Sequence, residues 1–326
     1  MPYLPRLLST IAIIFCSIAI GWLARRAAET GKIPIAATSL EKLRKYLQTS
    51  AIFFLLPFSA MLSLWGLPHP RAELLILPFL GLLSYICGGI MAICAARLLR
   101  LDRRQSGSFF CCGTFTNIGA VGGLVCLFFL GENTIALVAL YRLVEELYYF
   151  SIAFPIAQWF GSADSNTRFN LRAFRISPML IAVILALLLG ITLNLAQVYR
   201  PSMCTQLASL SMVIATVFFL FSIGITLHFT RLKGDIGKSI VICAIKFIGI
   251  PAIVIPVAWA CGLGQFESGL PLKTVAILCS MPVAMTALVP PSLFGLDVDL
   301  ANACWIFSTV CLVIVLPALM WLLPML

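Results

Sequence analysis

Charged residues are scarce in this chain. Only 10% of its 326 residues are Asp, Glu, Lys or Arg, whereas 61% are hydrophobic and the mean hydropathy is +1.07. Soluble domains carry about 25% charged residues, so this composition excludes a water-soluble globular protein. It predicts an all-α polytopic membrane protein whose principal partner is the lipid bilayer.

Catalytic and metal-binding motifs are also lacking. The sequence has no HExxH, no GxSxG and no CxxC, and its two histidines, His69 and His228, lie near the ends of apolar segments. No Asp lies inside an apolar segment, which disfavours a paired-aspartate protease. The twelve cysteines lie mostly inside these segments, where they are expected to pack as small apolar residues. We therefore expect no enzymatic activity, no cofactor and no metal site.

Long apolar runs dominate the sequence. Ten of them approach or exceed the ~20 residues that cross a bilayer core. No connection between them is long enough for a soluble domain, so the chain is expected to form one membrane domain. The predicted segments are 7–24, 48–65, 73–97, 107–129, 134–158, 177–197, 207–228, 238–262, 272–294 and 300–324.

The net charge of +10 comes from basic residues in alternate connections. Lys and Arg gather in the cytoplasmic loops of membrane proteins, so this alternation predicts that both termini lie outside the cytoplasm. It also accounts for the charge without a nucleic acid partner. The basic clusters lie within 25–45, 97–104, 168–175 and 231–238, and the opposite side carries only Arg6, Arg71, Arg200 and Lys273.

Five segments in each half predict an inverted repeat. An odd number of crossings makes the second half enter the membrane from the opposite side, and transporters with this symmetry hold their substrate near the midplane. A weak sequence similarity at an offset of about 165 residues supports the division. We predict a first repeat at 1–160, a cytoplasmic linker at 161–176 and a second repeat at 177–326.

Two of the apolar segments contain helix breakers in their middle, at 113–123 and 279–291. Gly clusters, Pro and Asn at membrane depth require an explanation, because a helix in lipid normally satisfies its own backbone. Counted from the segment ends, Asn117 and Pro282 both lie about 15 Å deep, which is half the hydrocarbon thickness. Interrupted segments at corresponding positions of two halves are typical of a transporter's substrate site.

The residues around the two breaks predict a binding site. The backbone N–H groups at the start of a half-helix carry partial positive charge and suit a carboxylate. The alternative is that the Gly residues only permit close helix packing and the Pro residues only kink the helices. The candidate binding residues are Thr116, Asn117, Ile118, Gly119, Gly122, Ser280, Met281, Pro282 and Thr286.

Four ionisable residues lie inside apolar segments: Arg142, Glu145, Glu146 and Lys246. Each would cost about 2.5–3.5 kcal/mol if unpaired in the membrane. Arg142 can pair with one of the two acids, which lie three and four residues further along the helix. The other acid can be protonated, meet Lys246 or face water, and Lys246 can instead hold a substrate carboxylate. Proton coupling and a purely structural charge cluster both remain open.

Several motifs resemble those of the auxin efflux carrier family. Thr116-Asn117-Ile118-Gly119 with Gly122 is similar to the family's motif in the fourth segment. Phe15 with 21–23, and the pair 56–57, are similar to its first two segments. The runs 280–284, 293–297, 307–309 and 316–317 are similar to its C-terminal signature. The resemblance covers nearly the whole chain. It implies ten helices in an inverted five-plus-five repeat, a scaffold and a moving transport domain, and broken helices four and nine that cross.

The same resemblance implies a secondary transporter for a small organic anion, such as a mono- or dicarboxylate, working by elevator-type or rocking alternating access. Family members carry auxin in plants and malate or malonate in bacteria. The short linker is typical of prokaryotic members and implies a bacterial inner membrane. The anion, the direction of transport, the coupling ion and a homodimer stay open.

Three departures from the family pattern concern the pocket and the coupling. Gly122-Gly123-Leu124 stands where the family has a Pro, and Thr286 stands where an Asn often follows Met-Pro. The cluster of Arg142 with the two glutamates is not expected from the family. Two other functions are therefore kept: a sodium- or proton-coupled carrier of the bile-acid symporter or sodium/proton antiporter type, and a non-transporting membrane sensor.

Overall fold

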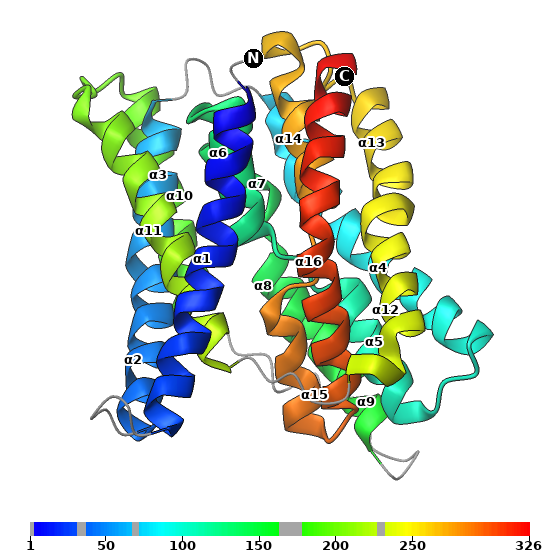
Figure 1. Cartoon of the computed structure of the whole chain (residues 1–326). Coiled ribbons are helices and arrows are strands. Elements are labelled where there is room, and N and C mark those ends of the chain that lie inside the picture. Colours follow the sequence, from blue (N-terminus) through cyan, green and yellow to red (C-terminus); the bar gives the residue numbers. More distant parts are fainter. Residues whose placement is uncertain (1–2, 31–36, 67–71, 163–177, 227–231) are drawn as a thin grey trace. The chain divides into compact units, whose positions relative to one another are not determined.

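The computed structural model of the chain describes residues 3–30, 37–66, 72–162, 178–226 and 232–326 (Figure 1). Within these ranges every regular element is a helix and no strand forms. His69, His228 and all but the first two residues of the predicted linker lie outside the described residues.

Six helical stretches among the described residues are long and apolar enough to cross a membrane. This indicates an integral membrane protein and confirms the helical class predicted from composition. The count of ten crossings and the inverted repeat stay predictions. The six stretches are Leu8–Glu29, Lys42–Trp65, Glu73–Leu98, Met203–Ile225, Ile236–Ala260 and Val298–Met325.

The other four predicted segments form shorter helices, and three of them are interrupted. Segment 107–129 contains α5 (Arg103–Thr114), the π-helical η3 (Ile118–Gly122) and α6 (Gly123–Leu130). Segment 272–294 contains α14 (Leu270–Cys279), the 3-10 helix η9 (Met285–Leu288) and α15 (Val289–Phe294). Both predicted breaks are therefore present. The uninterrupted segment is α10 (Pro178–Leu195).

Segment 134–158 has a third break that the sequence did not predict. Its α-helical parts are α7 (Asn133–Tyr141), α8 (Glu145–Tyr148) and α9 (Phe154–Gly161), with the π-helical η4 (Tyr149–Ala153) between the last two. Residues 142–144 form a turn in place of an α-helix. The prediction of one continuous helix over this segment is therefore wrong at residues 142–144, which include Arg142.

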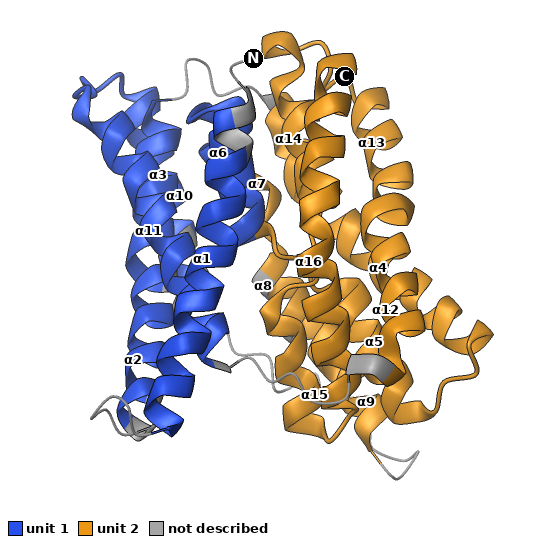
Figure 2. Cartoon of the chain, in the orientation of Figure 1, with its two compact units in different colours: residues 1–72, 119–139, 178–228 blue, residues 73–118, 140–177, 229–326 orange. Residues whose placement is uncertain are grey.

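The chain forms two compact units (Figure 2). Unit 1 comprises Met1–Ala72, Gly119–Ala139 and Pro178–His228, and unit 2 comprises Glu73–Ile118, Leu140–Ser177 and Phe229–Leu326. Each unit takes segments from both predicted halves. The units are defined by which residues pack together, whereas the repeats were predicted from the order of segments along the sequence. The units therefore do not test the repeats, and the division into repeats stays a prediction.

Unit 1 is a helical bundle in which backbones approach closely. It contains α1 (Tyr3–Glu29), α2 (Ala37–Ser50), α3 (Leu56–Trp65), α10 and α11 (Met203–Thr226). A β-carbon added to Gly21 of α1 would collide with the carbonyl oxygen of Phe221, and one added to Gly224 of α11 with that of Ile18. Small residues at such contacts let membrane helices pack on their backbones.

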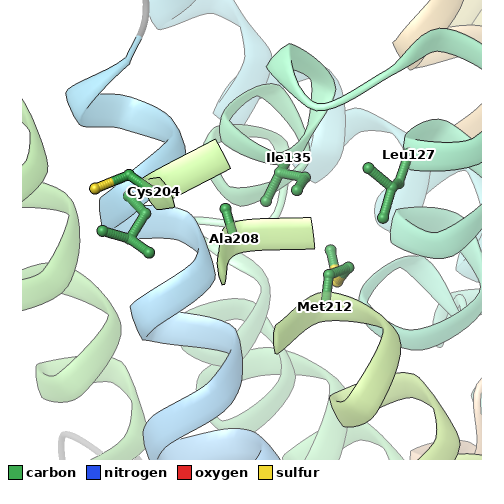
Figure 3. Packing of buried hydrophobic residues seen from close by; sticks show 6 residues of the cluster. Leu127, Ile135, Cys204, Ala208 and Met212 are labelled. Atoms are coloured by element: carbon green, nitrogen blue, oxygen red, sulfur yellow. The ribbon is translucent and has the colours of Figure 1, made fainter. Parts of the chain in front are cut away.

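A small apolar core joins the elements of unit 1 (Figure 3). Its buried members are Leu62, Leu127, Ile135, Cys204, Ala208 and Met212. Hydrogen bonds and an ion pair also link these elements. The hydroxyl of Ser59 donates to the carbonyl of Ala208 at 2.6 Å. Arg200 pairs with Glu132 at 2.7 Å and also donates to the carbonyl of Leu62 at 3.1 Å.

Unit 2 packs α4 (Leu77–Leu98) on α5, α13 (Ile250–Ala260) on α14, and α12 (Ile236–Ala244) on α16 (Val298–Leu322). Aspartates cap two of these helices. Asp102 accepts from the backbone N–H of Gln105 at the start of α5, and Asp297 accepts from that of Leu300 at the start of α16. The hydroxyl of Ser108 donates to the carbonyl of Asp297 at 2.7 Å, which ties α5 to the start of α16.

The close contact of α1 and α11 predicts a stability effect. Gly224→Val is expected to lower the melting temperature by several degrees, because overpacking typically costs about 1–3 kcal/mol. Gly237→Val is the matched control, since no described atom lies within 4 Å of an added β-carbon there. Thermal unfolding of the purified variants in detergent measures both. Equal melting temperatures for Gly224→Val and the wild type would contradict the packing described for unit 1.

Candidate functional site

Each of the two predicted breaks contains a stretch of extended backbone, and both stretches lie in unit 2. Helix α5 ends at Thr114, Phe115 is extended (φ −78°, ψ 120°), and helical structure resumes at Ile118. Helix α14 ends at Cys279, and residues 281–284 have no helical turn before η9 begins at Met285. Pro282 favours this geometry because it lacks an N–H and cannot continue the helical ladder.

The two extended stretches pair with each other. Thr116 and Val283 form an antiparallel bridge. The N–H of Asn117 donates to the carbonyl of Pro282 at 2.9 Å, and the N–H of Ala284 donates to the carbonyl of Phe115 at 3.1 Å. We call residues 115–117 and 282–284 the crossing. The two backbone segments, remote in sequence, thus supply part of the hydrogen bonding that each lost by leaving its helix.

Two hydroxyl groups from other elements complete this bonding. The N–H of Thr116 donates to Oη of Tyr149 at 3.2 Å, and the N–H of Val283 donates to Oγ of Ser308 at 3.2 Å. Tyr149 belongs to η4 and Ser308 to α16. Both acceptors matter because an unpaired buried N–H costs about 1–3 kcal/mol.

Aromatic rings support the first break. The ring of Phe115 lies 4.1 Å from that of Tyr149, measured between centroids, and 5.9 Å from that of Phe154. Tyr85 of α4 continues the cluster, with its ring 5.4 Å from that of Tyr149. Because Tyr149 contacts both the backbone and the side chain of the first break, its hydroxyl is held at the Thr116 N–H.

Lys246 reaches the crossing from the π-helical segment η7 (Ile245–Gly249). Its side chain is fully buried, and Nζ donates to the carbonyl of Phe115 at 3.1 Å and to Oγ1 of Thr116 at 2.7 Å. Among the described residues Lys246 forms no ion pair with a carboxylate. The side-chain nitrogen of Lys246 is therefore held at the crossing by two neutral oxygens.

The other charged residues form a separate group. Nε of Arg142 lies 2.8 Å from Oε2 of Glu145, whose side chain is 6% exposed. This is one of the two pairs that the helical spacing allowed. The side chain of Glu146 lies outside the described residues. The roles predicted for this cluster in coupling stay predictions.

The predicted binding residues divide into three groups. Thr116, Asn117, Ile118, Met281 and Pro282 lie buried at or beside the crossing. Ser280 is buried next to it, but its hydroxyl donates to the carbonyl of Ala276 in its own helix at 2.8 Å, and Thr286 lies exposed in η9. Gly119 and Gly122 belong to η3 within unit 1.

The sequence reasoning did not identify Tyr149 or Ser308 as contributors. Ser308 lies in the run 307–309 that resembles the family signature, whereas Tyr149 has no comparable motif. A structural signal does mark the region: η7 carries Lys246, η4 carries Tyr149, and η3 begins directly after Asn117. Single π-helical turns inside α-helices are frequent at functional sites.

Within the described ranges, no group of three His, Cys, Asp or Glu side chains lies close enough together to hold a metal ion. No model of a known protein family matches the chain, and comparison with curated proteins gives no match. The likeness to auxin efflux carriers therefore rests on the sequence motifs.

The support of the crossing by Tyr149 is testable. Tyr149→Phe keeps the ring but removes the acceptor of the Thr116 N–H, so we expect a loss of about 1–3 kcal/mol in the free energy of unfolding. Tyr85→Phe is the control in the same ring cluster, because the buried hydroxyl of Tyr85 has no hydrogen-bond partner in the described part of the chain. Melting temperatures of the two variants give the comparison. An equal decrease in both would disprove the role of the Tyr149 hydroxyl.

Proposed function

We propose that this protein is a secondary transporter that moves a small organic anion, such as a mono- or dicarboxylate, across the membrane by alternating access. The observation that carries the proposal is the crossing, where two interrupted membrane segments pair backbone to backbone at Thr116 and Val283. Discontinuous helices that meet in this way are typical of substrate sites in secondary transporters.

The chemistry at the crossing favours an anion. The buried ammonium of Lys246 contributes a positive charge. The helix that resumes at Ile118 adds the partial positive charge of its N-terminal end. Asn117, whose side chain lies at this helix start, can supply a neutral hydrogen bond. A carboxylate is the ligand that such an arrangement stabilises best.

The alternative reading of both segments as kinked helices fits the hydrogen bonds less well. A kink leaves a helix to recover its bonds within itself or to nearby side chains. Here Asn117 and Ala284 donate to the backbone of a remote segment, and Thr116 and Val283 donate to side chains of two further elements. This specific bonding supports a site rather than a packing defect.

The remaining features of the proposal follow the family resemblance. The short linker favours a bacterial inner membrane, and the distribution of Arg and Lys favours termini outside the cytoplasm. The division into two compact units supports an elevator-type or rocking movement, since such movement requires two bodies.

The proposal predicts stabilisation by its substrate. We expect a mono- or dicarboxylate to raise the melting temperature of the purified protein with a saturable dose response, because a ligand at 100 times its Kd contributes about 2.7 kcal/mol. A thermal-shift panel of carboxylates, with amino acids and sugars as neutral or zwitterionic controls, tests this. A response confined to the controls would contradict an anion site.

Asn117→Ala tests the site itself. The substitution keeps the backbone N–H that bonds to Pro282, and it removes only the side-chain amide. Because a hydrogen bond to a charged group contributes about 1.5–3 kcal/mol, uptake of the stabilising carboxylate into proteoliposomes should fall by about 10- to 150-fold in kcat/KM.

Asn133→Ala is the matched control, because it makes the same change at the exposed first residue of α7. It should transport as the wild type does, and the melting temperatures of both variants show whether a fall in uptake reflects the site or the fold. Unchanged uptake in Asn117→Ala would refute the site assignment.

A further inference from the structure

The ammonium of Lys246 is bound in an unusual way for a buried charge. Its side chain is fully buried, and its partners among the residues that the structure describes are a backbone carbonyl and a hydroxyl. Removing an ammonium from water costs several kcal/mol, and proteins usually offset this with a carboxylate. In the same unit the carboxylate of Glu145 pairs with another cation, Arg142.

The two oxygens that hold Lys246 are of the kind that bind a metal cation. Phe115 is the residue that caps the C-terminus of α5, so its carbonyl lies at the partially negative end of a half-helix. In transporters with broken helices, unwound carbonyls and half-helix C-terminal ends coordinate the coupling Na⁺. The hydroxyl of Thr116 adds a second neutral oxygen from the same break.

We infer that the Lys246 ammonium occupies, as a permanent part of the chain, the place of a bound monovalent cation at the crossing. The positive charge that an anion carrier would otherwise obtain by binding Na⁺ is then supplied by the chain itself. The inference rests on the proposed function as far as transport is concerned, but the occupancy of the oxygen site is independent of it. Two consequences follow: the wild type needs no Na⁺, and removal of the side chain opens a cation site.

Lys246→Ala tests the second consequence by thermal unfolding of the purified full chain. Melting temperatures are compared in choline, sodium, lithium and n-propylammonium chloride at equal ionic strength. The n-propylammonium ion matches the atoms that the substitution removes. The wild type should give one melting temperature in all four salts. Lys246→Ala should melt several degrees lower in choline and regain stability, saturably, in sodium, lithium or n-propylammonium.

Two further variants make the response specific. Lys246→Ala combined with Thr116→Val lacks the Thr116 hydroxyl and should lose most of the cation response. Lys238→Ala removes a lysine that pairs with Asp235 at 2.9 Å outside the crossing, and it should show no cation-specific response. A purely structural role for Lys246 would lower stability in every salt alike.

Three results would overturn the inference. One is a Lys246→Ala variant that responds to none of the small cations. Another is full recovery of stability in choline by adding Glu146→Gln to Lys246→Ala, which would identify Lys246 as an ion-pair partner of Glu146. The third is a requirement for Na⁺ in carboxylate uptake by the wild type. This result can be obtained even if Lys246→Ala does not fold. Wild-type uptake that is unchanged when choline replaces Na⁺ supports the inference, whereas absence of any carboxylate uptake refutes only the proposed function.

Discussion

Every backbone polar group at membrane depth needs a hydrogen-bond partner, and unit 2 is organised around this constraint. At the crossing two segments leave the helical ladder, where an unsatisfied group in lipid would cost several kcal/mol. Asn117 and Ala284 use the opposite segment, Thr116 uses Tyr149, and Val283 uses Ser308. These partners come from the extended stretches that follow α5 and α14, from η4 and from α16. The elements that hold the crossing must therefore move together, and they do belong to one compact unit.

Unit 2 neutralises its buried charges in two different ways. Arg142 and Glu145 lie 2.8 Å apart, so their opposite charges largely cancel at a distance. The described partners of Lys246 are neutral, so they stabilise the ammonium locally without cancelling its charge. A ligand approaching the crossing would therefore experience the field of Lys246 more than that of Arg142. This difference connects the anion preference to one side chain, and it follows from the hydrogen bonds rather than from the composition.

Local sequence signals predicted the breaks, but not what supports them. Gly, Asn and Pro mark the two breaks directly, and counting residues from the segment ends placed Asn117 and Pro282 at one depth, where the structure joins them by a hydrogen bond. The turn at 142–144 was missed because Arg142, Leu143 and Val144 include no Gly or Pro. Tyr149 and Ser308 were missed because one sequence does not reveal which remote hydroxyl meets a free N–H. Ser280 was given a role in binding, although a serine in a membrane helix commonly donates to a carbonyl of its own helix, as it does here.

The carbonyl of Phe115 links the backbone pairing to the charge. It accepts from the N–H of Ala284 and from Nζ of Lys246, which uses both of its lone pairs. A displacement of the second break that lengthened the Ala284 bond would leave Lys246 as the main partner of this oxygen. A displacement of Lys246 would weaken the local support of the first break. The position of the charge and the geometry of the two breaks are therefore coupled through one atom, so a ligand that contacts either one acts on both.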